Sequence, residues 1–140
     1  MDIASFAKSA EVIAHEIIYA YGMAPEDYYP VEEEVLSVYV FGAVNAYSQT
    51  LKLDEISELM FHVAMISVFS HQFGYDEKKT ERAYQFCVKC TDKSYNPVLY
   101  TVFHRGIDAF FLLQQPEKLE ADIKSIMSPI FKSMGIDEES

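Results

Sequence analysis

The sequence predicts an all-α fold: a compact bundle of about six helices forming a single domain over residues 1–135, followed by a frayed acidic tail over residues 136–140. Apolar residues recur at steps of three and four, which places them on one face of a helix. Prolines and capping residues stand where helices would begin, and glycines stand where they would end. The chain has 140 residues, half of them hydrophobic, which is enough to bury one core.

The first two helices are predicted from their boundaries. The first covers about residues 2–21, and Gly22 is a natural stop. Met23–Pro30 is predicted to be a loop, stiffened by a proline near each end. A second helix then begins at Pro30, because acidic residues in a first turn complement the helix dipole.

The second helix is apolar on nearly every side from Val35 to Tyr47. A helix of this kind is either central in a bundle or part of an interface. The β-branched run Val38–Phe41 would also suit a strand, but no second strand is available to pair with it, so a helix is favoured.

Four more helices are predicted from their starting residues, which are Asp54, Asp76, Asn96 with Pro97, and Pro116. The third ends at Gly74, and its apolar stripe is predicted to consist of Ile56, Leu59, Met60, Val63 and Ser67. The fourth carries Ala83, Phe86, Cys87 and Cys90 on one stripe, and the fifth runs to about Gln115. Pro129 must kink or break the sixth helix before Gly135 ends it.

The net charge is −11, and its distribution is uneven. Residues 1–70 hold 11 Asp and Glu against Lys8 and Lys52, a balance of −9, whereas residues 71–140 hold 11 against nine Lys and Arg, a balance of −2. An acidic surface repels nucleic acid and anionic lipid and attracts basic partners. No apolar stretch approaches the roughly 18 residues of a membrane span, and no signal peptide is visible. We therefore expect a cytoplasmic protein that binds neither nucleic acid nor membrane.

Cys87 and Cys90 form a CxxC pair. In redox enzymes this spacing sits at a helix N-terminus, where the dipole lowers the thiol pKa. Here the pair falls late in the predicted fourth helix, and a zinc site would need two further ligands. Core packing is therefore favoured over metal binding or redox chemistry.

The remaining candidates for catalysis are weak. His15 and Glu16 begin an HExxH motif whose second histidine is missing, and His62 and His71 are nine residues apart on one helix. His104, Arg105 and Asp108 could form a polar cluster, but no serine elbow accompanies them. Arg105 is instead expected to neutralise an acid inside the bundle. No phosphate-binding glycine loop is present, so the sequence predicts a protein that is not an enzyme, with no cofactor and no metal.

One segment combines carboxylates with tyrosines around a stiffened loop and a helix start. Tyrosine offers a large contact area at low entropic cost, and acidic neighbours steer a basic partner. The simpler alternative is a solvated loop whose tyrosines fold back over the core. We predict that the segment binds a partner through Glu26, Asp27, Tyr28, Tyr29, Glu32, Glu33 and Glu34.

The acidic segment Glu26–Glu34 and the apolar helix Val35–Asn45 that follows it resemble the small helical immunity proteins of bacterial toxin systems. The resemblance implies a binding protein that neutralises a cognate toxin by occluding it. The toxin is expected to have a basic surface. Two alternatives remain. One is a scaffold or regulatory subunit that forms a homodimer through the apolar second helix. The other is a small helical enzyme or metal protein that uses His104, Asp108 or the cysteine pair.

Overall fold

The computed structural model describes residues 2–51 and 57–135. Over these ranges the chain forms helices and no strand, which confirms the all-α prediction. The elements are α1 (Ile3–Tyr21), η1 (Pro25–Asp27), α2 (Pro30–Thr50), α3 (Glu58–His71), α4 (Glu77–Lys89), α5 (Pro97–Ala109), η2 (Phe110–Leu112) and α6 (Pro116–Met134), where η1 and η2 are short 3-10 turns. The predicted tail at 136–140 and the predicted cap Asp54 lie outside the described residues.

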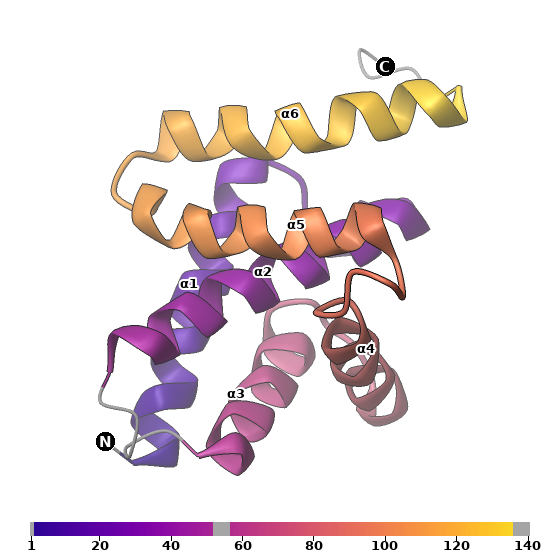
Figure 1. The fold of residues 1–140 in the computed structure, drawn as a ribbon. Coiled ribbons are helices and arrows are strands. Elements are labelled where there is room, and N and C mark those ends of the chain that lie inside the picture. The colour runs from indigo at the N-terminus through magenta and orange to yellow at the C-terminus, as the bar shows by residue number, and fades with distance from the viewer. Residues whose placement is uncertain (1, 52–56, 136–140) are drawn as a thin grey trace.

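The helices pack around α2 and α5, which cross each other at the centre of the molecule (Figure 1). In this view α6 lies above the crossing, and α3 and α4 extend below it. Helix α1 runs behind, where it packs against α3, α6 and α2. The main neighbours of α4 are α3 and α2, so α4 forms one flank of the bundle.

The helix ends follow local chemistry. The side chains of Asp76 and Asn96 accept hydrogen bonds from backbone amides three residues ahead, at 2.8 and 3.1 Å, as their predicted capping roles require. Gly22 and Gly135 end α1 and α6 with φ values of 84° and 71°, a left-handed conformation that glycine adopts without steric cost. Helix α3 is capped by Ser57, whose hydroxyl accepts the amide of Met60 at 3.1 Å.

Three predicted boundaries change. The third helix ends at His71, three residues before Gly74, and the fifth gives way at Ala109 to the turn η2. Pro129 does not break α6, which continues to Met134 as one helix. Its ring lies on the exposed side, where a backbone carbonyl that has lost its helical partner can bind water instead.

Helix α2 is apolar on nearly every side, and such a helix is either central in a bundle or part of an interface. In the structure α2 is central. Its buried residues run almost without interruption from Val35 to Val44 and occupy every face of the helix. They pack against α5, α1, α4 and α3 within one chain. The apolar residues through which the homodimer alternative would join two copies are therefore already covered within one chain.

The apolar positions predicted for α3 are correct only in part: Met60 packs against the core, and Ile56 lies outside the described residues. The side chains that α3 buries are Ala64, Met65, Val68 and Phe69. Leu59 and Val63, which the sequence pattern placed on the core stripe, are exposed. The error arises because α3 is apolar around most of its circumference, so spacing alone does not select the face that packs.

Candidate partner-binding surface

The predicted partner-binding segment spans η1 and the first turns of α2. Glu26 and Asp27 are exposed on η1, and Glu34 is exposed on α2. Tyr29, which immediately precedes α2, has 51% of its surface exposed, and Glu33 is half-buried. These five residues therefore form the accessible part of the segment.

Glu32 does not reach the surface, since only 1% of its area is exposed. One carboxylate oxygen accepts the backbone amide of Tyr29 at 2.8 Å, and the other accepts the hydroxyl of Tyr21. Glu32 occupies the third position of α2, so the first of these bonds satisfies an amide at the start of the helix, as in a capping box. Its role in the structure is to fix the start of α2 against α1.

Tyr28 is buried as well, with 8% of its area exposed. Its ring packs edge-on against Tyr21, with centroids 5.7 Å apart, and its buried hydroxyl has no hydrogen-bond partner among the residues that the structure describes. Burial, followed by the nearby Glu32 carboxylate, raises the pKa of Tyr28 above its usual range. This tyrosine folds back over the core, whereas Tyr29 stays at the surface with its ring edge-on to Phe131 of α6.

A hollow of about 220 Å³ lies beside the segment, between the start of α2 and α4. Glu33 and Glu34 line one side, and Lys79, Arg82 and Phe86 of α4 line the other. The ammonium of Lys79 is 3.0 Å from a Glu33 carboxylate oxygen. The negative charge of Glu33 is thus partly compensated within the chain.

A family model described as Immunity protein 48 matches residues 6–132. The chain belongs to this immunity-protein family. No curated protein and no solved structure matches it. Membership confirms the resemblance to immunity proteins and implies a cognate toxin as partner. Immunity proteins are in general non-catalytic. The groups that the sequence offered for catalysis or metal binding are therefore considered next as parts of such a protein.

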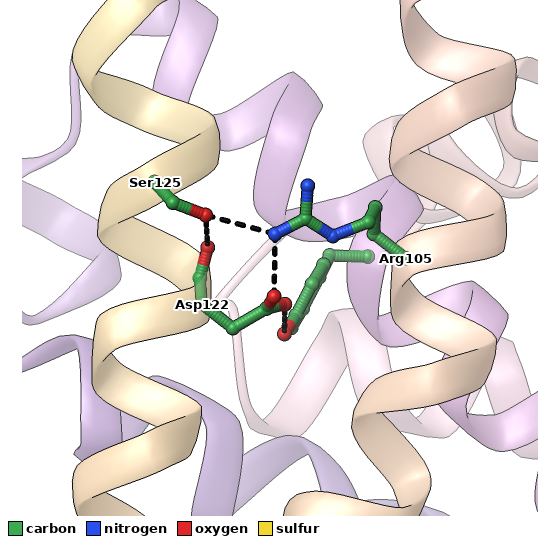
Figure 2. Close-up of polar contacts among 4 residues, drawn as sticks. Arg105, Asp122 and Ser125 are labelled. Carbon is green, nitrogen blue, oxygen red and sulfur yellow. Dashed lines mark hydrogen bonds and ion pairs between the residues drawn. The ribbon is translucent and has the colours of Figure 1, made fainter.

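The polar cluster at Arg105 is structural in this immunity protein. Figure 2 shows the guanidinium reaching from α5 to α6, where it pairs with Asp122 and donates to the Ser125 hydroxyl at 2.8 Å. The other Asp122 oxygen accepts the hydroxyl of Tyr39 from α2 at 2.6 Å. The prediction that Arg105 neutralises an acid inside the bundle is confirmed, and the acid is Asp122. The sequence could not identify Asp122, because the pairing joins two helices.

The two cysteines of this immunity protein are fully buried and unpaired, which confirms the core-packing interpretation. Burial raises the pKa of Cys87 well above its usual range. Burial and, to a lesser degree, the negative charge of Glu34 raise the pKa of Cys90 to about 11. A thiol held in its neutral form is a poor nucleophile and a poor metal ligand.

The histidines lie apart on α1, α3 and α5. His62 is 3.0 Å from a carboxylate oxygen of Glu81, and His71 is 2.7 Å from one of Glu11. Within the described ranges, no group of three or more histidine, cysteine, aspartate and glutamate side chains is arranged to hold a metal ion. Over the same ranges, every helix is too short or too polar to cross a membrane.

Proposed function

We propose that this protein neutralises a cognate toxin by binding it and covering its active site, without catalysing a reaction itself. The observation that carries this proposal is the match of residues 6–132 to an immunity-protein family. The burial of the cysteine pair and the pairing of Arg105 with Asp122 are consistent with a binding role, because the thiols are enclosed and the guanidinium is engaged in holding α5 against α6.

The accessible part of the acidic segment is the proposed binding region: Glu26, Asp27, Tyr29, Glu33 and Glu34. Exposed carboxylates attract a basic partner over a distance of about 8 Å at physiological salt, and they act mainly on the association rate. Tyr29 supplies an exposed aromatic ring beside them, and aromatic side chains are common at the centre of interfaces. The buried side chains of Tyr28 and Glu32 lie beneath this region, on its core side, and support it.

The test uses a candidate toxin domain, chosen from the genes that neighbour the gene for this protein. Producing that domain alone in bacteria should stop growth, and producing this protein with it should restore growth. The purified proteins should form a stable complex, measured by surface plasmon resonance. A toxin domain whose activity is unchanged by an excess of this protein would overturn the proposed function.

A second set of variants tests whether the acidic region contributes to binding. Replacing Glu26, Asp27 and Glu34 with their amides should slow association severalfold and flatten its dependence on salt. Replacing Tyr29 with Ala should act on the dissociation rate instead, because truncating an aromatic contact weakens the bound state. The matched control carries three amide substitutions at the exposed acids Glu16, Asp108 and Glu117, which change the net charge equally. Equal rates for the two triple variants would show that only total charge matters.

A further inference from the structure

Helix α3 carries exposed apolar residues as well as polar ones on the side that it turns away from the protein. It buries Ala64, Met65, Val68 and Phe69, largely against α1. On its other side Leu59 and Val63 are 64% and 39% exposed. A helix with apolar residues on both its packed and its outward side is unusual at a protein surface, where the outward side is normally polar.

Helix α4 extends this apolar face. Val88 is 40% exposed on α4, and it lines two adjoining hollows, one between α3 and α4 and one that is also lined by α2. The hollows measure about 300 and 320 Å³ and share Glu58, Tyr84 and Val88. In Figure 1 the two helices lie side by side below the α2–α5 crossing.

The floor of this α3–α4 groove is aromatic and held in place by ring contacts. The Tyr84 ring is stacked against His62 with centroids 4.1 Å apart, and Phe41 of α2 meets Tyr84 edge-on at 6.1 Å. Phe61 of α3 packs edge-on against Phe41 at 5.2 Å. The groove therefore has a fixed aromatic base and exposed aliphatic walls, a surface suited to receiving an apolar side chain.

The charges around the groove indicate what kind of partner would bring that side chain. Glu58 lines both hollows, and Glu81 stands beside them through its hydrogen bond to His62. A symmetric dimer formed here would bring the same carboxylates of two copies together, each copy with a net charge of −11. A partner with lysine or arginine around an apolar residue would meet opposite charges instead.

We propose that the α3–α4 groove is a second contact site for the toxin and that it receives an apolar side chain flanked by basic residues. This inference rests on the proposed function. It concerns a surface distinct from the acidic segment, because Lys79, Arg82 and Phe86 line the hollow beside the segment whereas Tyr84, Gln85 and Val88 line the α3–α4 groove.

The test compares two double variants in binding to the same toxin domain. Replacing Leu59 and Val88 with Ser should weaken binding by about tenfold or more, mainly through faster dissociation. The control replaces Val12 and Val98 with Ser, because these valines are 54% and 60% exposed on α1 and α5. The control should bind like the unchanged protein, and circular dichroism should give the same helix content for both variants.

A charge reversal tests the basic flank separately. Glu58 and Glu117 are both acids in the first turn of a helix, α3 and α6 respectively, so replacing either with Lys has a similar effect on the helix dipole. Glu58→Lys should weaken toxin binding severalfold more than Glu117→Lys does.

The outcomes separate this inference from the proposed function. If the unchanged protein binds the toxin and the Leu59→Ser, Val88→Ser variant binds equally well, the groove proposal is overturned while the proposed function stands. If light scattering shows a dimer that this variant converts to a monomer, the groove joins two copies and the proposal is likewise overturned. If the unchanged protein does not bind the toxin, both proposals fail together.

Discussion

Gly42 of α2 lies directly against Gly106 of α5. A Cβ atom on Gly42 would be 3.1 Å from the Cα of Gly106 and would overlap the carbonyl oxygen of Phe103. A Cβ atom on Gly106 would overlap the carbonyl oxygen of Tyr39. The two central helices therefore cross with backbone against backbone, and both crossing positions require glycine.

Replacing Gly42 or Gly106 with Ala should destabilise the protein. Helix propensity alone favours alanine by about 1 kcal/mol, but the overlap is with backbone atoms that cannot rotate away. We expect each change to lower the free energy of unfolding by about 1–3 kcal/mol. Urea denaturation followed by circular dichroism measures this, with Ser70→Ala on the exposed side of α3 as the control. A Gly106→Ala variant as stable as the unchanged protein would contradict the close crossing.

The Asp122 carboxylate should matter far more to stability than a neighbouring surface carboxylate. Asp122→Ala leaves the buried Tyr39 hydroxyl and the Arg105 guanidinium without their shared acceptor, at a cost of about 2–3 kcal/mol. Glu120 pairs with Lys124 on the exposed side of the same helix, and Glu120→Ala should cost about 0.5 kcal/mol or less. Urea denaturation of both variants gives the comparison. Equal costs would show that the Arg105 cluster does not hold α6 in place.

Glu32 and Glu34 are two residues apart, but their substitution should affect different properties. Replacing Glu32 should lower stability, whereas replacing Glu34 should slow association with the toxin. Glu32→Ala removes the carboxylate that accepts the Tyr29 amide and the Tyr21 hydroxyl, so it should cost about 2 kcal/mol of stability. Glu34→Ala removes an exposed side chain and should change stability by about 0.5 kcal/mol or less, while slowing association with the toxin. Thermal unfolding and binding kinetics on both variants check this division. A stable Glu32→Ala protein would contradict the capping role.

The buried thiols should make the protein sensitive to alkaline pH. An ordinary thiol has a pKa of 9.0, whereas the pKa of Cys90 in the folded protein is about 11. The folded protein therefore keeps a proton that the unfolded chain releases. The stabilisation is fully present below about pH 9 and is lost as the pH rises towards 11.

The measurement is the free energy of unfolding at several pH values between 8 and 11. It should fall with rising pH, and the fall should be smaller when Cys87 and Cys90 are both replaced with Ala. We expect the cavity to lower the stability of the double variant at every pH, so the slope is compared rather than the absolute value. The same slope in both proteins would mean that the thiols ionise freely in the folded state.

The sequence by itself determined the helices. Asp76, Asn96 and Pro97 start helices in the structure as their capping chemistry predicts, and Gly22 and Gly135 end them. These assignments depend on hydrogen bonds to amides within three residues and on the φ angle of a single residue. Local chemistry of this kind is fully present in the order of the residues.

The tertiary structure decided which surfaces are covered. Helices α2 and α3 are both apolar on most sides, but α2 is enclosed by its neighbours whereas α3 leaves Leu59 and Val63 exposed. Likewise, Glu32 is buried and Glu34 exposed within one run of three glutamates, because only Glu32 faces Tyr21 of α1. Periodicity states which residues share a face of a helix. Which face is buried depends on helices distant in the sequence, and the surface open to a partner is what they leave uncovered.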